Sequence, residues 1–196
     1  MRLCVSSIPS EGEKVGNPSA SAYRVSVIAE YSQRRRLSQR WIRELVRGVL
    51  AAEDVSPRSR IEVLLAGDET VRQLNAIHLS EDAVTDVLSF PAINGVETEG
   101  FPAISGGWRD IGQIATSVPQ ANRQAVEQGH GLQDEVAHLI VHGVLHLLGF
   151  DHQEVVDEAR MRQHEETLLR EIAGISVGGM HKTKAHKALA GAPAGP

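Results

Sequence analysis

Three histidines between residues 142 and 152 have the type and spacing of metal ligands. His142 and His146 are four residues apart, so on a helix their side chains point from one face toward a single ion. His152 follows six residues later, which is too far around a continuous helix to join them. Gly149 removes this difficulty, because glycine readily adopts the left-handed conformation that ends helices and lets the chain turn back. Three imidazoles with an open fourth position are typical of catalytic zinc.

A His-x-x-x-His pair alone often occurs by chance, but the third histidine and the glycine make a metal site the stronger interpretation. The layout resembles the extended zinc motif of metzincin proteases. Those enzymes carry a glutamate directly after the first histidine as general base, whereas this chain has Gly143 there. The sequence therefore favours a metal centre and disfavours a peptidase. The apolar residues that bury the other faces of the helix are Val144, Leu145, Leu147 and Leu148.

Other groups near the histidines must then move protons. Asp151 is a candidate catalytic residue, although it could instead orient His152 or cap the turn. Glu135 is a second candidate, or simply a favourable charge in the first helical turn. His138 lies four residues before His142 and is either a substrate-facing group or a partly buried polar side chain.

The composition is that of a small globular protein. The chain has 196 residues, 41% of them hydrophobic, and its single cysteine cannot form an internal disulfide. Residues 1–22 lack the apolar stretch of a signal peptide, and no run approaches the roughly 20 apolar residues of a membrane span. We therefore expect a cytoplasmic protein that does not associate with membranes.

The formal net charge of −5 does not point to a nucleic-acid-binding protein, but arginines gather in one segment. Four of them share a helical face that could follow phosphates, and a solvated helix surface is an equally good explanation. These four are Arg36, Arg40, Arg43 and Arg47, and Arg34 and Arg35 precede them.

Hydrophobic periodicity predicts strands that alternate with helices. Ser38, Asp68 and Ser117 are the expected helix caps, and Pro91 is expected to end a strand or mark a sheet edge. Asp86 and Ser89 are expected to cap and form turns rather than to contact substrate. The predicted strands are 23–31, 61–66, 84–90 and 110–116, and the predicted helices are 38–54, 68–77, 117–128, 133–148 and 153–173.

These elements predict one α+β domain (mixed α/β) with about four strands and about five helices. We expect this domain over residues 23–174, between a disordered leader (1–22) and a disordered tail (175–196).

Several segments together resemble the YbeY-type metal-dependent endoribonucleases of bacteria. They follow the family's order at its approximate spacing, and the resemblance covers about residues 23–173. The segments are Leu74-Asn75, the run Thr85-Asp86-Val87-Leu88-Ser89-Phe90-Pro91, Asp110-Ile111 and the stretch from Glu135 to His152.

This resemblance implies an endonuclease that cuts single-stranded RNA, matures ribosomal RNA at the 3′ end of the small-subunit RNA, and takes part in ribosome quality control. It also implies a zincin-like fold with a mixed sheet. It implies one Zn²⁺ held by His142, His146 and His152, with His142 also catalytic beside an arginine. Imidazole ligands also accept nickel, iron or copper. The nucleophile stays open between a metal-bound hydroxide and the RNA 2′-hydroxyl.

The chain departs from the family pattern where that arginine is usual, because Leu79 occupies the position. A guanidinium binds phosphate bidentately, so either activity is reduced or another cation substitutes. The candidates are Arg72, His78 and Arg109, of which Arg109 borders the expected cleft and is the one we select. Two further departures are Val84, where proline is usual, and Arg109 itself, where glycine is usual.

Two other functions remain as alternatives. One is a zinc peptidase-like hydrolase, and the other is a ribosome-associated RNA-binding protein with reduced catalysis.

Overall fold

A computed structural model describes residues 22–30, 37–92, 107–150 and 155–175. The predicted leader and tail lie outside these ranges, apart from residues 22 and 175, and stay predictions. Within the described part, no helix has both the length and the apolarity needed to cross a membrane.

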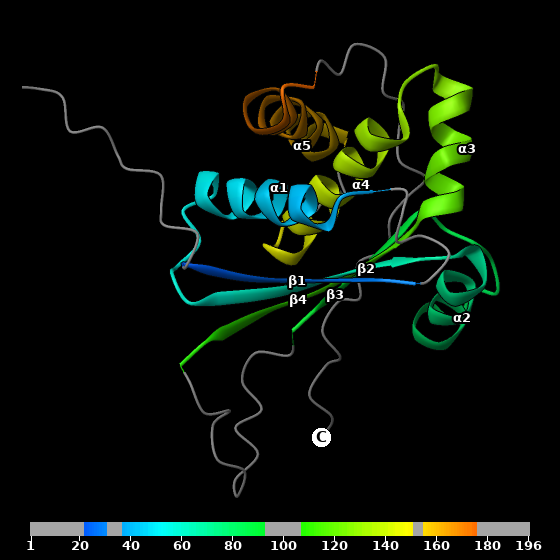
Figure 1. The fold of residues 1–196 in the computed structure, drawn as a ribbon, viewed down its shortest axis with the longest axis horizontal. Coiled ribbons are helices and arrows are strands. Elements are labelled where there is room, and N and C mark those ends of the chain that lie inside the picture. Colours follow the sequence, from blue (N-terminus) through cyan, green and yellow to red (C-terminus); the bar gives the residue numbers. More distant parts are fainter. Residues whose placement is uncertain (1–21, 31–36, 93–106, 151–154, 176–196) are drawn as a thin grey trace, which may run out of the picture.

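The sheet has four strands in the order β1-β2-β4-β3 (Figure 1). β1, β2 and β4 are parallel, and β3 runs antiparallel to β4 at one edge. The predicted mixed sheet is therefore confirmed. The strands are β1 (Tyr23–Ala29), β2 (Ser59–Ala66), β3 (Val87–Pro91) and β4 (Arg109–Ser117).

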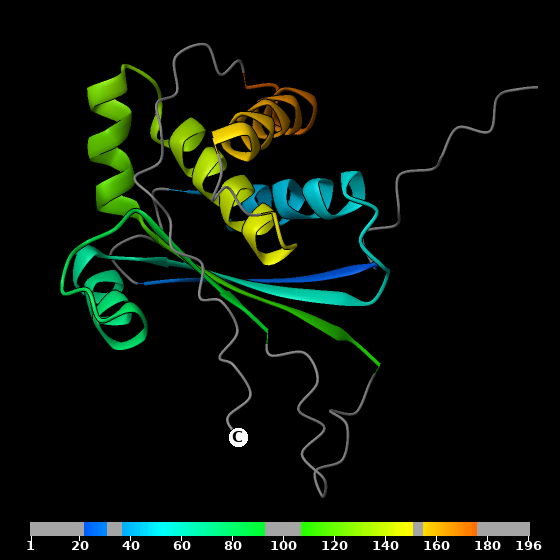
Figure 2. The ribbon, with the colours of Figure 1, turned by 180° about the vertical axis from the view of Figure 1, so that it is seen from behind.

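The helices cover the two faces of this sheet unequally. α1, α4 and α5 lie in layers on one face, here called the inner face, and α2 lies against one end of the opposite, outer face (Figures 1 and 2). The single α+β domain with five helices is confirmed. The helices are α1 (Gln39–Ala52), α2 (Asp68–Leu79), α3 (Val118–Gln128), α4 (Leu132–Leu147) and α5 (Val155–Leu168), which continues as a π-helical turn (Leu169–Ala173).

Side-chain alternation explains the two faces. In β1, every second residue from Tyr23 is buried and the residues between them are exposed, so Val25 and Val27 lie inward while Ser26 and Ile28 lie on the outer face. Among the described residues, the longest buried segment is the middle of α4, in which every residue from Glu135 to His146 is buried. α4 is thus fixed by packing on all sides.

Two of the three predicted helix caps are confirmed. The Ser38 hydroxyl accepts a hydrogen bond from the Trp41 N–H at 3.3 Å, and the Ser117 hydroxyl accepts one from the Gln120 N–H at 3.2 Å. The prediction for Asp68 was wrong, because Gly67 is the cap residue and Asp68 is already helical.

The carboxylate of Asp68 instead joins α2 to α3. It lies 2.9 Å from the Arg123 guanidinium and accepts a hydrogen bond from the Ser117 hydroxyl at 2.5 Å. The hydrogen bond from Arg123 is the main reason that the pKa of Asp68 lies below its usual value. The Asp68 side chain therefore makes long-range contacts in place of the predicted cap.

The strand predicted over 84–90 begins later, at Val87, and includes Pro91 as its last residue. The delay has a local cause, because the chain bends at Asp86, whose buried carboxylate accepts a hydrogen bond from the Val87 N–H at 2.8 Å. Asp86 also accepts one from the Gln124 side chain at 2.9 Å. The expected edge position of this strand is confirmed, and the turn-forming role of Asp86 stays a prediction.

Candidate metal centre

α4 brings His142 and His146 together on one face. Their Nε2 atoms are 3.1 Å apart, and both side chains are buried. Two imidazole nitrogens bound to one tetrahedral zinc ion at about 2.0–2.1 Å would be separated by roughly 3.3 Å. The pair therefore fits a shared ion, as the spacing of the two residues predicted.

The turn after α4 is also as expected. The helix ends at Leu147, and Gly149 has a φ of +93°, in the region that L side chains rarely adopt. The Gly149 N–H donates to the His146 carbonyl at 3.0 Å. His152 and Asp151 lie outside the described residues, and the described ones contain no group of three possible ligands. The third ligand and the role of Asp151 stay predictions.

Glu165, on α5, is the residue that the sequence analysis missed. Its carboxylate Oε1 lies 2.6 Å from the Nδ1 atom of His142, and only 5% of the residue is exposed. An Nδ1–H that donates to this carboxylate leaves the Nε2 lone pair of His142 for a metal and fixes the ring orientation. A carboxylate behind a ligand histidine is a common supporting arrangement in metal sites.

A local signal for Glu165 does exist in the sequence. It shares the inward face of α5 and of the π-helical turn with apolar residues at helical spacing, which are Met161 and Leu168 on α5 and Leu169 in the turn. A charged residue on such a face requires a buried partner. Which partner it meets depends on how α5 packs against α4, and the sequence pattern does not contain that information.

Hydrogen bonds keep Glu165 ionised although it is buried. Burial is the largest influence on the pKa of Glu165 and raises it, but the hydrogen bonds and charges of His138 and His142 together lower that pKa to about 2. For His138, burial lowers the pKa, and the combined effect of Glu165, Glu135 and Asp86 raises it above its usual value. His138 lies 3.6 Å from Glu165 and is 7% exposed, so the expected partly buried polar side chain is confirmed.

Glu135 occupies the first turn of α4, as the second of its two predicted roles requires. Its carboxylate lies 3.1 Å from the His130 ring. Burial is the main cause that raises the pKa of Glu135, and the nearby His138 and His130 partly oppose it. Glu135 therefore belongs to a polar group at the beginning of α4, in which Glu135 and His138 are buried and His130 is partly exposed.

Gly143 faces the sheet. The Ser89 hydroxyl donates to the Gly143 carbonyl at 3.2 Å, so Ser89 ties β3 to α4 instead of forming the predicted turn. A Cβ added at residue 143 would lie 3.1 Å from the Ser89 hydroxyl and 3.2 Å from two Ile114 side-chain carbons. A protease-like glutamate at this position would press into the inner face of the sheet.

Leu79 and two candidates for the missing arginine, Arg72 and Arg109, differ in their surroundings. Leu79 packs against a small apolar cluster of the outer face, and Arg72 is paired with Glu69 at 2.9 Å and with Asp82. The pKa of Arg72 is raised, chiefly by its hydrogen bond to Glu69. Arg109 is exposed at the beginning of β4, where its backbone N–H donates to the backbone carbonyl of Arg58. The substitution by Arg109 stays a prediction.

The predicted helical face of arginines is described only in part, because residues 34–36 lie outside the described ranges. Arg40 pairs with Glu44 at 2.8 Å, and Arg43 donates to Gln39 at 3.2 Å. These intrahelical partners are typical of a solvated helix surface.

Known proteins share both the sequence pattern and the fold of this chain. The family model described as endoribonuclease YbeY matches residues 27–173. An endoribonuclease YbeY from Dehalococcoides mccartyi is 32% identical over 156 residues, which cover 77% of this chain and 98% of the relative. Another, from Desulforamulus reducens, is 40% identical over 131 residues, covering 67% and 84%.

A solved structure matches as well. The solution structure of TM1509 from Thermotoga maritima has a TM-score of 0.51 and 20% sequence identity, and the match covers 80% of this chain and 99% of that one. This likeness shows a shared fold. Together with the match over residues 27–173, the relatives show that the chain belongs to the YbeY endoribonuclease family, as its motifs predicted.

Proposed function

We propose that this chain is a metal-dependent endoribonuclease that cleaves single-stranded RNA. The observation that carries the proposal is the pair of Nε2 atoms of His142 and His146, 3.1 Å apart on a buried helix, with His142 supported from behind by Glu165. A ligand pair of this kind in a chain of an endoribonuclease family fits metal-assisted cleavage of a phosphodiester.

In this proposal His142, His146 and His152 hold one Zn²⁺. When bound, the ion would act as a Lewis acid on a phosphate oxygen. The donor set of neutral imidazoles suits zinc, and Glu165 raises the basicity of the His142 ring while holding it in place.

The remaining roles fall to groups around the ligands. Asp151, next to His152 in the chain, would accept or donate a proton during cleavage. Arg109 would bind the phosphate in place of the arginine that Leu79 replaces. His142 would hold the metal and thereby position the phosphate for attack.

The RNA substrate in the cell would be ribosomal. We propose action at the 3′ end of the small-subunit RNA and in ribosome quality control, with the small ribosomal subunit as partner and the cytoplasm as location. The domain that performs this function would span residues 23–174. Family membership supports these proposals.

The test is cleavage of a labelled single-stranded RNA by the purified protein, with and without a chelator, and with casein as a parallel substrate. We expect RNA cleavage that the chelator abolishes and that added zinc restores, with casein intact. His142→Ala should reduce cleavage to the background rate. The chemical ends of the products would distinguish attack by water from attack by the 2′-hydroxyl. Chelator-resistant cleavage, or cleavage of casein alone, would contradict the proposal.

Leu79 favours a second function, namely RNA binding with reduced catalysis. An apolar side chain stands where the family usually has a phosphate-binding cation. RNA binding without measurable turnover, in a preparation that holds stoichiometric zinc, would support this function over the first.

A further inference from the structure

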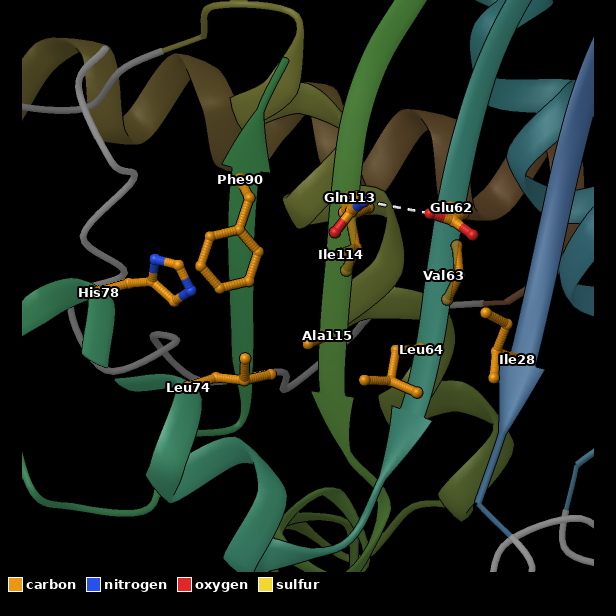
Figure 3. A pocket seen from close by; sticks show the side chains of 10 residues that line it. All are labelled: Ile28, Glu62, Val63, Leu64, Leu74, His78, Phe90, Gln113, Ile114 and Ala115. Carbon is orange, nitrogen blue, oxygen red and sulfur yellow. Dashed lines mark hydrogen bonds between the residues drawn. The ribbon is translucent and has the colours of Figure 1, made fainter. Parts of the chain in front are cut away.

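The outer face of the sheet contains a hollow of about 270 Å³, away from the histidines of α4 (Figure 3). β1, β2, β3 and β4 all contribute side chains to it, and α2 closes one end with Leu74 and His78. Aliphatic side chains, among them Leu64 and the half-exposed Ile28, form much of its lining. The hollow is therefore mainly apolar, open to solvent and close to the size of a small-ligand site.

Two rings form one wall of the hollow. The ring centres of His78 and Phe90 are 4.9 Å apart and their planes meet at 60° (Figure 3). Phe90 is partly buried and His78 is exposed, so each leaves ring surface accessible. An aromatic wall beside aliphatic side chains favours a flat heteroaromatic ligand, because such a ligand can stack on a ring.

A polar pair lies beside Phe90, because Gln113 on β4 is the cross-strand neighbour of Phe90 and Glu62 on β2 is that of Gln113. The Gln113 side-chain amide donates to the Glu62 carboxylate at 3.1 Å (Figure 3). The amide nitrogen uses one of its two hydrogens on Glu62, so the pair offers a ligand one remaining N–H and three acceptor oxygens, two on the carboxylate and one on the Gln113 carbonyl. The edge of a suitable ligand must therefore carry hydrogen-bond donors.

We propose that this hollow binds a purine base of single-stranded RNA, with guanine preferred. Guanine carries two adjacent donors, N1–H and the 2-amino group, which one carboxylate can accept together, whereas adenine offers only its amino group. The ligand class rests on the proposed function. Recognition of unstacked bases by aromatic side chains and by hydrogen bonds to base edges is the usual means of reading single-stranded RNA.

The same face offers a cation and another aromatic ring. Arg24 is exposed on the outer face of β1, with its guanidinium carbon 4.3 Å from the centre of the Trp108 ring. It lies four residues from Ile28 along β1, or roughly 13 Å. A cation and a ring at this distance from the hollow suit the phosphates and bases of an adjoining RNA segment, and so favour RNA over an apolar protein segment.

β3 connects the hollow to the metal centre. Ser89 contacts α4 through the Gly143 carbonyl, and the next residue, Phe90, lines the hollow. β3 is an edge strand of the described sheet, so no other described strand pairs with its free side. An RNA strand that passes around this edge would reach both sites, and a base held in the hollow would fix which phosphodiester meets the metal.

The test measures binding of fluorescein-labelled uridine hexamers that carry one internal guanosine, inosine or adenosine. The full-length protein is used with a chelator, which prevents cleavage. We expect guanosine to bind about tenfold more tightly than adenosine, as one bidentate base contact provides, with inosine between them because it lacks the 2-amino group.

The variants are Glu62→Gln, Phe90→Leu and, as a control, Glu127→Gln on the exposed surface of α3. Glu62→Gln should remove the preference for guanosine, because the amide no longer offers two acceptor oxygens. Phe90→Leu keeps an apolar side chain but loses the ring, and should weaken binding of every hexamer about fivefold or more. Glu127→Gln should match the wild type. Thermal unfolding of each variant checks that the fold is intact.

Equal affinity for the three hexamers, or unchanged selectivity in folded Glu62→Gln, would overturn the inference. So would concentration-dependent self-association that Phe90→Leu abolishes, because the hollow would then bind a second protein chain. The separate cleavage assay distinguishes the two proposals. Chelator-sensitive cleavage with no base preference contradicts only the base site, and selective binding without cleavage contradicts only the nuclease.

Discussion

On the inner face of the sheet, Val63 and Ile114 are almost fully buried beneath α1 and α4, whereas Ile28 on the outer face is 51% exposed. The inner face meets the helix that carries the paired histidines, and the outer face carries the hollow with its rings and polar pair. Both faces belong to the same four strands.

The difference separates two requirements of the molecule. The proposed metal ligands would require a fixed geometry, and close packing on the inner side provides it through α4 and Glu165. A surface that accepts a flexible strand must leave side chains accessible, and the outer face does so because α2 covers only one end of it. Substitutions on the two faces should therefore have different consequences.

The largest difference is expected for a glutamate at residue 143. Gly143→Glu would force a side chain against Ser89 and Ile114 and bury a carboxylate between α4 and the sheet. We expect a loss of about 3 kcal/mol or more in the free energy of unfolding, measured with urea. Ser26→Glu, on the exposed outer side of β1, should change it by only about 0.5 kcal/mol or less. A stable Gly143→Glu variant that cleaves casein would show that residue 143 faces the metal instead.

Glu165→Gln should act on the inner side without a steric effect. The amide keeps the shape of the side chain but gives His142 a neutral hydrogen-bond partner, so we expect zinc affinity to fall about 10- to 100-fold. Competition with a chromophoric chelator measures this affinity. Glu166→Gln, at the exposed neighbouring position of α5, should bind zinc like the wild type. Equal affinities in the two variants would remove Glu165 from the metal centre.

Leu79→Arg should act at the border of the outer face. If Leu79 stands where the family uses a phosphate-binding cation, the arginine should raise kcat/KM for RNA about tenfold, equivalent to one charge-assisted hydrogen bond. Leu79→Gln loses the same packing without adding charge and should not raise it. If the two variants have the same rate, the position has no role in phosphate binding.

The smallest effect is expected at Glu135, and it depends on pH. Because burial raises the pKa of this carboxyl above 4.5, the folded protein holds the proton to higher pH than the unfolded chain does. The free energy of unfolding therefore falls as the pH rises from the pKa of Glu135 in the unfolded chain through its pKa in the folded protein. Glu135→Gln should raise the unfolding temperature at pH 7, and the gain should disappear below about pH 4.

Asp134→Asn provides the control, since it removes a partly exposed carboxylate one residue earlier in the same turn. It should slightly lower the unfolding temperature at pH 7, because it loses a favourable charge at the helix N-terminus. A lower unfolding temperature for Glu135→Gln as well would mean that His130 and His138 outweigh the cost of burying the carboxylate.

Features with a local cause could be predicted from the sequence. The Ser38 and Ser117 caps, the His142–His146 pair and the left-handed Gly149 depend on residues within a few positions of one another. The strands could also be located, because alternating apolar residues mark them wherever they pair. Their mixed directions were expected only from the resemblance to the family.

Features that depend on distant partners could not be predicted. Asp68 pairs with Arg123 and does not cap its helix, and Glu165 contacts His142, which lies 23 positions earlier in the sequence. The hollow needs the strand order as well, since Glu62 and Gln113 become neighbours only when β2 pairs with β4. Local sequence patterns determine the helices and strands, whereas the packing of these elements determines which polar groups come into contact.

The burial of α4 has a thermodynamic consequence for metal binding. Since apolar packing holds this helix from Glu135 to His146, folding does not wait for the ion, unlike in small zinc domains that unfold without it. An ion that binds only the folded chain then adds about 1.4 kcal/mol of stability for each tenfold excess over its dissociation constant. The melting temperature should therefore rise in proportion to the logarithm of zinc concentration, and would report metal occupancy without any RNA.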